Sequence, residues 1–301
     1  MKVTAQSNRP EDWVTFTDWC ANKENLTPEA QHTVEVLLRE ARTEECDRAE
    51  RILSSERLLD LRNNQIEDLT PLASLTNLRV FFLDDNNIKD ITPLANLTKL
   101  SGLFLRDNQI EDISPLVNLT NLRDLILTDN KIKNLPPLDK LKNLGTLLLE
   151  DNQIEEVTSL ANLTDLRVLY IGHNRIEEIT PLTNLKNLRL LALHNNQIED
   201  ITPLANLINL TASFLEGNRI ENVDPLANLI NMTELVLDNN RIEEIDPLAK
   251  LANLTELSLR DNRIEDTSVL ANLTRLEKLN LERNPLGDRI CPVQPESICR
   301  F

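Results

Sequence analysis

The residues of this 301-residue chain that could carry chemistry are its three histidines and four cysteines. Asp151, His173 and His194 recur at nearly equal spacing, so a repeating fold would bring them together. Two imidazoles beside a carboxylate could hold a metal ion or change charge near neutral pH. A polar turn is the ordinary alternative, and it is the one we expect. No Ser-His-Asp or Cys-His arrangement can be assembled, and there is no glycine-rich phosphate loop. The sequence therefore predicts no enzyme, no metal site and no cofactor.

The cysteines form one pair near each end of the chain, Cys20 with Cys46 and Cys291 with Cys299. One bridge at each end is the natural pairing, although sequence alone does not fix connectivity. Bridges would indicate an oxidising compartment. The start of the chain, MKVTAQSNRPEDW, has no apolar core of a signal peptide, which favours the cytoplasm. The compartment stays open, and without a Cys-x-x-Cys pair we expect no zinc site.

The overall charge narrows the classes of partner. The formal net charge is −17, which disfavours a nucleic-acid backbone or an anionic membrane and would suit a basic partner. There is no apolar run long enough to span a membrane.

Asparagine recurs every 22 residues without an insertion, which is the signature of a repeat array. The positions are Asn64, Asn86, Asn108, Asn130, Asn152, Asn174, Asn196, Asn218, Asn240, Asn262 and Asn284. One unit reads LRDLILTDNKIKNLPPLDKLKN, and others end in ITPLANLT or DPLANLI. A proline in most units excludes long continuous helices. An accidental leucine-rich helical protein would not keep this spacing through eleven units.

Each unit predicts one coil of a solenoid. The Leu-x-Leu alternation indicates a short strand with leucine inward, as at Leu125 and Leu127. Asn130 should then turn inward, where its amide can satisfy backbone groups freed by the turn, so stacked asparagines would form a buried ladder. Pro-Leu-x-x-Leu should make a short helical turn on the outer side, beside acidic pairs such as Glu111-Asp112 that we expect to be only a solvated edge. Ser213 takes an inward leucine position, where a hydroxyl needs a partner.

The ends of the array should be capped, because an open solenoid end exposes core. We expect a helical N-terminal cap at 1–55, eleven repeats at 56–284 and a C-terminal cap at 285–301, in one structural domain. Thr27-Pro28 is an N-cap followed by proline, which predicts a helix from Pro28 to about Arg42. A second helix should cover 44–54, and Trp13 and Trp19 should seal the first coil.

With these residues in hand, the chain resembles leucine-rich repeat proteins of the 22-residue class found in bacterial internalins and in a eukaryotic regulator of protein phosphatase 1. The caps, FTDWCANKENLTPEAQHTVEVLLREA and CPVQPESICRF, resemble leucine-rich repeat proteins of cyanobacteria. The resemblance implies an α/β solenoid: a right-handed curved superhelix with a parallel β-sheet on the concave side, short 3-10 or irregular convex turns, and protein binding as its use.

The concave face carries the candidate site. The outward position four residues before each repeat asparagine holds apolar or aromatic side chains in eight successive coils, over roughly 34 Å. The partner-binding candidates are Phe82, Phe104, Ile126, Leu148, Tyr170, Phe214 and Val236, with Asp84, Arg106 and Glu150 on a charged rim. We expect non-enzymatic recognition of a protein ligand by this face of a monomer. The alternatives are self-association through the concave faces, plain β-propensity of the column, and a structural or engineered scaffold without an evolved ligand.

Overall fold

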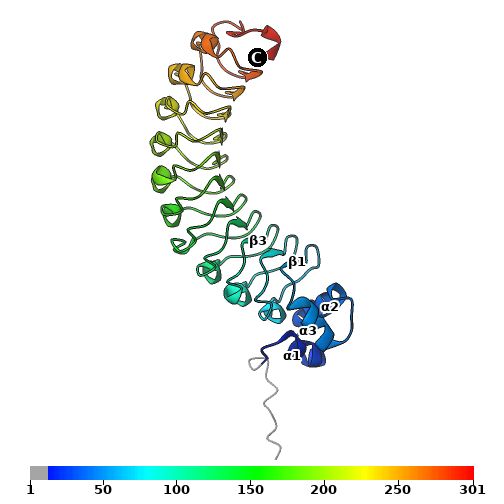
Figure 1. The fold of residues 1–301 in the computed structure, drawn as a ribbon. Coiled ribbons are helices and arrows are strands. Elements are labelled where there is room, and N and C mark those ends of the chain that lie inside the picture. Colours follow the sequence, from blue (N-terminus) through cyan, green and yellow to red (C-terminus); the bar gives the residue numbers. More distant parts are fainter. Residues whose placement is uncertain (1–12) are drawn as a thin grey trace, which may run out of the picture.

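The computed structural model describes residues 13–301, and its dominant feature is a twelve-stranded sheet in which every strand runs parallel to its neighbours. The strands follow one another in sequence order. They are β1 Leu58–Asp60, β2 Val80–Phe82, β3 Gly102–Phe104, β4 Asp124–Ile126, β5 Thr146–Leu148, β6 Val168–Tyr170, β7 Leu190–Ala192, β8 Ala212–Phe214, β9 Glu234–Val236, β10 Glu256–Ser258, β11 Lys278–Asn280 and β12 Cys299–Arg300. Figure 1 shows an arc with the strands along its inner edge, so the expected concave parallel sheet is confirmed.

Short 3-10 turns line the outer edge of the arc (Figure 1). They are η3 Thr70–Leu72, η4 Thr92–Asn96, η5 Ser114–Leu116, η6 Thr158–Leu160, η7 Thr180–Asn184, η8 Thr202–Leu204, η9 Asp224–Leu226, η10 Asp246–Lys250 and η11 Ser268–Asn272. The acidic residue before a turn often holds its start: Asp90 Oδ1 accepts a hydrogen bond from Thr92 N at 2.8 Å. Hydrogen bonds from the Thr202 side chain and backbone likewise lower the pKa of Asp200. The expectation of a merely solvated acidic edge is therefore wrong for these aspartates.

The coil that follows Asn130 has no 3-10 turn, which corrects the expectation for that unit. Pro136 stands where Thr92 stands in an earlier unit, and Asn134 where Asp90 stands. Proline has no N–H, so Pro136 cannot form the backbone hydrogen bond that Thr92 donates to Asp90.

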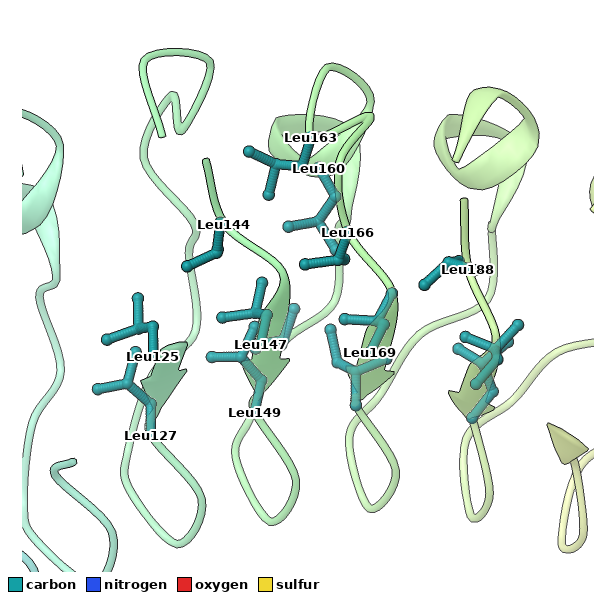
Figure 2. Packing of buried hydrophobic residues seen from close by; sticks show 14 of the residues in the cluster. Leu125, Leu127, Leu144, Leu147, Leu149, Leu160, Leu163, Leu166, Leu169 and Leu188 are labelled. Atoms are coloured by element: carbon teal, nitrogen blue, oxygen red, sulfur yellow. The ribbon is translucent and has the colours of Figure 1, made fainter. Parts of the chain in front are cut away.

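The core is one continuous stack of leucine and isoleucine between the strands and the outer turns. Figure 2 shows Leu147 of β5 and Leu149, which directly follows that strand, beside Leu125 and Leu127 of the coil before. All four side chains are fully buried. Each such side chain contributes about 2 kcal/mol by leaving water. Because the burial of one coil requires its neighbours, the array is stable only as a stack.

The repeat asparagines hold the turn after each strand. Asn130 Nδ2 donates to the carbonyls of Leu105 at 2.9 Å and Leu127 at 3.1 Å, while its Oδ1 accepts from Ile110 N at 2.9 Å. The amide thus connects its own coil with the preceding one. The same donor and acceptor pattern recurs from Asn86 to Asn284. Asn64, at the first coil, instead accepts from Arg39 of the cap.

The residue before each of these asparagines has a left-handed backbone, which the sequence analysis missed. Values of φ lie near +55°, for example +54° at Asp129 and +51° at His173. Asn, Asp and His tolerate this region better than other residues with a side chain. The residues directly before the repeat asparagines are almost all Asn, Asp, Gly or His, and this pattern could have predicted the left-handed backbone. His173 is therefore accounted for by backbone geometry alone.

Three helices cover the first coil: α1 Phe16–Ala21, α2 Pro28–Glu40 and α3 Cys46–Leu53, with a 3-10 turn η2 Lys23–Asn25 between the first two. Helices α2 and α3 lie where they were expected, and the Thr27 side chain accepts from Ala30 N at 3.2 Å as the N-cap. Helix α1 was not anticipated. Its Phe16 is fully buried, whereas Trp13 and Trp19 pack edge-to-face on each other and stay partly exposed. The bridge Cys20–Cys46 joins α1 to α3.

The C-terminal segment extends the sheet rather than only covering it. After η12 Glu296–Ile298, strand β12 pairs with β11, and Cys299 lies opposite Leu279. Cys299 thus continues the inward leucine column and is bridged to Cys291. Both disulfide pairings match the natural pairing at each end. No helix within residues 13–301 combines the length and apolarity needed to cross a membrane.

Candidate functional site

The outward column of apolar side chains lies on the concave face, in unbroken register. Phe82 pairs with Phe104, Leu148 with Tyr170, and Phe214 with Val236 across adjacent strands. Ile126 occupies the same position in β4. These seven side chains are half-buried rather than fully exposed. We call them the apolar stripe: Phe82, Phe104, Ile126, Leu148, Tyr170, Phe214 and Val236.

The stripe is interrupted at Ala192, which corrects the expected run of eight apolar coils. Ala192 lies between Tyr170 and Phe214 in the sheet and is only 2% exposed. A methyl group is too short to rise above two flanking aromatic rings. Ala192 therefore divides the column into two segments of partly exposed apolar side chains.

The aromatic end of the stripe is rigid. The rings of Phe82 and Phe104 stack at 4.5 Å between centroids, with 27° between their planes. Gly102 leaves room for this, since a Cβ there would lie 3.1 Å from the Phe104 ring. The Arg62 guanidinium lies 5.0 Å from the Phe82 ring centre and is held by Asp60 at 2.6 Å. Arg62 was not among the candidates from the sequence. It lies two residues after Asp60, which occupies the position of Phe82 in the preceding strand.

The charged rim at the strand ends is largely used by the fold itself. Asp84 Oδ1 accepts a hydrogen bond from Arg106 N at 2.8 Å, and Arg106 Nε contacts Asp107 at 3.0 Å. Burial raises the pKa of Asp84 despite the hydrogen bond from Arg106 N. The pKa of Glu216 is also raised by burial. This edge therefore carries crowded, partly desolvated carboxylates.

A histidine and a carboxylate meet at the middle of this rim. His194 Nε2 lies 3.8 Å from Glu150 Oε1, and both side chains are mostly buried. Burial lowers the pKa of His194 and raises the pKa of Glu150, which favours the neutral form of each. Gly172 makes this placement possible, because a Cβ there would clash with the His194 ring at 2.4 Å. Other coils fill the position of Gly172 with Arg, Asp, Glu, Thr or, in the next coil, His194.

His173 completes the group that the spacing had suggested. Its ring lies 5.0 Å from that of His194 in an edge-to-face arrangement, and its Nδ1 lies 4.0 Å from Asp151 Oδ1. Asn195 Nδ2 lies 3.1 Å from His173 Nε2. Within residues 13–301, no three His, Cys, Asp or Glu side chains are arranged to hold a metal ion. The four side chains are polar groups at the ends of neighbouring strands, and His173 and Asp151 are about half exposed.

Ser213 lies in the core beneath the stripe. It is fully buried between Leu191 and Leu235 of the neighbouring strands, and its Oγ makes no hydrogen bond within the described structure. We expect Ser213→Leu to raise the free energy of unfolding by about 1 kcal/mol, because an unpaired hydroxyl is replaced by buried methyl groups. Guanidinium denaturation followed by circular dichroism measures this. A lower midpoint than that of wild type would show that the site has no room.

The exposed apolar side chains outside the concave face include Ile208 and Ile230, which the sequence analysis missed. Ile208 and Ile230 are 53% and 55% exposed, on adjacent coils between the outer turns and the strands. The same position holds Thr98 and Lys142 in other coils. They provide a matched surface for testing the stripe.

Family models of leucine-rich repeats match most of the repeat array. The model described as "Leucine Rich repeats (2 copies)" matches residues 57–96, 76–119, 98–140, 164–206 and 206–250, and that described as "Leucine rich repeat" matches 230–286. Together the matched segments cover more than half of the chain. No curated protein matches the chain.

Solved structures with similar folds include two bacterial proteins and one plant protein. The internalin InlF of Listeria monocytogenes is 31% identical, with a TM-score of 0.72 over 88% of this chain and 92% of that one. The internalin C2 of the same species is 33% identical, with a TM-score of 0.58 over 75% and 91%. The ectodomain of the Arabidopsis thaliana receptor kinase GASSHO1/SCHENGEN3 is 26% identical, with a TM-score of 0.65 over 76% and 32%. That ectodomain was solved in complex with Casparian strip integrity factor 2.

Proposed function

Because this chain belongs to the leucine-rich repeat family, we propose that it binds a partner protein through the concave face of its sheet, without catalysis. Leucine-rich repeat proteins generally mediate protein–protein interaction, and the similar plant ectodomain was solved in complex with Casparian strip integrity factor 2. The apolar stripe is the observation that carries the choice of face. Aromatic anchors surrounded by charge are typical of binding hot spots.

Rigidity supports the proposal. The stripe is fixed by the strand register, and Phe82 and Phe104 are stacked on each other. Burial raises the pKa of Tyr170, with the charges of Glu150 and Glu234 adding to the effect, so the phenol stays neutral and available as a hydrogen-bond donor. A surface that is already ordered loses little conformational entropy when a partner docks.

Substitution of the aromatic anchors should abolish binding. We expect the variant Phe82→Ser, Phe104→Ser, Tyr170→Ser to lose the partner, since each anchor of this kind contributes about 2 kcal/mol or more to binding. The measurement is affinity capture from a lysate of the organism that encodes the chain, after circular dichroism has shown that the variant is folded. Tyr170→Ser alone serves if the triple variant is unstable.

The matched control is Ile208→Ser with Ile230→Ser, which removes exposed apolar side chains from another surface. It should capture the same partner as wild type. Loss of the partner in this control, with retention by the aromatic variant, would contradict the concave site. Identical captures by all three proteins, or none, would favour a scaffold without an evolved ligand.

A further inference from the structure

A row of arginines lies along the edge of the sheet where the strands begin. Arg79, Arg123, Arg167 and Arg189 directly precede β2, β4, β6 and β7, and all four side chains are exposed. Their carbonyls accept hydrogen bonds from the next coil, as between Arg79 O and Ser101 N at 2.7 Å. The row is therefore held in register with the sheet. We call these four residues the arginine row.

The arginine row is not neutralised by the protein. Within residues 13–301, none of its four guanidinium groups makes an ion pair or a side-chain hydrogen bond. Other repeat arginines differ: Arg106 contacts Asp107 at 3.0 Å, and Arg175 contacts Glu155 at 3.8 Å. With a formal net charge of −17, the chain has ample carboxylates for pairing. The four guanidinium groups are therefore unpaired because of where they lie, and their charge is available to a ligand.

A hollow with only positive charge lies within the row. A pocket of about 490 Å³ is lined by Arg79, Lys99, Ser101, Asn121 and Arg123. Lys99 Nζ is held by Asn77 Oδ1 at 2.7 Å. Three of the five lining residues are cationic and none is acidic. The chemistry that fits this hollow is an anion, and guanidinium groups bind carboxylates in a two-pronged geometry.

The spacing of the row suits an extended chain. Ser101 lies between Arg79 and Arg123, and Gly145 between Arg123 and Arg167. Arg79, Arg123 and Arg167 are therefore separated by about 10 Å each, twice the strand spacing, and Arg189 follows Arg167 by one strand spacing. A segment in the extended polyproline II conformation has three residues per turn and rises about 3.1 Å per residue, so every third side chain faces the same side and lies about 9 Å further along. Small residues between the arginines leave space for incoming side chains.

We propose that the partner presents an extended acidic segment, with carboxylates at about every third residue docking on the arginine row. This inference rests on the proposed function, because the apolar residues of the partner would then lie over the apolar stripe. The stripe is about 10 Å from the arginine row along the strands. The far edge of the face carries exposed carboxylates in the turns after the strands, such as Asp85 and Asp151, which would repel an acidic segment and so fix its side. The chain's net negative charge opposes this only weakly at contact distance, since salt screens charges beyond about 8 Å.

A nucleic acid is a poorer fit to the same row. Its backbone carries a charge along its whole length and would meet the acidic far edge as well as the arginines. A polypeptide can place carboxylates on one side only. The charge pattern across the face therefore favours a protein segment.

The test measures binding of labelled probes by fluorescence anisotropy. The probes are a synthetic peptide of Glu-Val-Ser repeats, a peptide of Lys-Val-Ser repeats of equal length, and a single-stranded DNA oligonucleotide. We expect the Glu peptide to bind wild type, and the variant Arg79→Gln, Arg123→Gln, Arg167→Gln, Arg189→Gln to bind it about tenfold or more weakly, given four exposed ion pairs. Higher ionic strength should weaken the same interaction.

The matched control changes the same charge elsewhere. Arg175, Arg219, Arg241 and Arg263 pair with Glu155, Glu199, Glu221 and Glu243 of the preceding coils, away from the row. Their replacement by Gln should change the affinity by less than about twofold. Equal weakening by both quadruple variants, no binding of the Glu peptide, or preference for the Lys peptide or the DNA would overturn the proposal.

The aromatic variant separates this inference from the proposed function. If Phe82→Ser, Phe104→Ser, Tyr170→Ser keeps the Glu peptide while the arginine variant loses it, the arginine row binds acidic segments but the stripe is not used. If the Glu peptide does not bind wild type but capture of a partner depends on the aromatic residues, the apolar stripe binds a partner and the proposal of an acidic segment is wrong.

Discussion

Replacing Asn130 by alanine is expected to lower the free energy of unfolding by about 3 kcal/mol. Its amide donates to the carbonyls of Leu105 and Leu127 and accepts from Ile110 N, all in the interior. Alanine would leave these backbone groups buried without partners, and each such group costs about 1–3 kcal/mol. Because two coils share the amide, the loss should loosen their stacking and not only one turn.

Guanidinium denaturation followed by far-ultraviolet circular dichroism measures this change. Asn121→Ala is the matched control, because Asn121 Nδ2 also bridges two coils, at 2.8 Å from Thr98 O, but from an exposed position. Water can replace that hydrogen bond, so we expect a loss below about 1 kcal/mol. Similar shifts for the two variants would show that burial of the repeat asparagine is not what makes it important.

Removing the bridge of the N-terminal cap should have the second large effect. Cys20 and Cys46 are 26 residues apart, and a bridge over a loop of this length stabilises by about 3 kcal/mol by restricting the unfolded chain. We expect Cys20→Ser with Cys46→Ser to lower the stability of the cap by about that amount. Cys291 and Cys299 are only 8 residues apart, so loss of their bridge should have an effect about 1 kcal/mol smaller.

The chain contains its own reporter for this experiment. Both tryptophans of the protein, Trp13 and Trp19, lie in the cap. Their fluorescence should report cap unfolding at a lower denaturant concentration than circular dichroism, which reports the whole array. In wild type the two transitions should lie closer together. Coincident transitions in the double serine variant would contradict a cap stabilised by this bridge.

Much of the site could be placed from the sequence, because residues that are 22 positions apart occupy equivalent places in neighbouring coils. Once Ile126 is recognised as an outward residue between the inward Leu125 and Leu127, adding or subtracting multiples of 22 gives the equivalent outward residue of every other coil. Phe82, Phe104 and Tyr170 were identified in this way, and the structure places them in one register. Which of them a partner contacts stays a prediction.

The sequence by itself determined the solenoid, the inward leucines and asparagines, the N-cap at Thr27 and the columns of the concave face, since these depend on patterns local to one repeat. Only the tertiary structure decided how neighbouring coils interact. It showed that Ala192 is buried, that Gly172 admits His194, and that Arg106 is paired whereas Arg79 is not. These outcomes depend on side-chain lengths and rotamers of residues one coil apart, about 4.8 Å away. The net charge suggested a basic partner, yet the placement of a few unpaired arginines indicates an acidic one, because close contacts respond to local charge rather than to its sum.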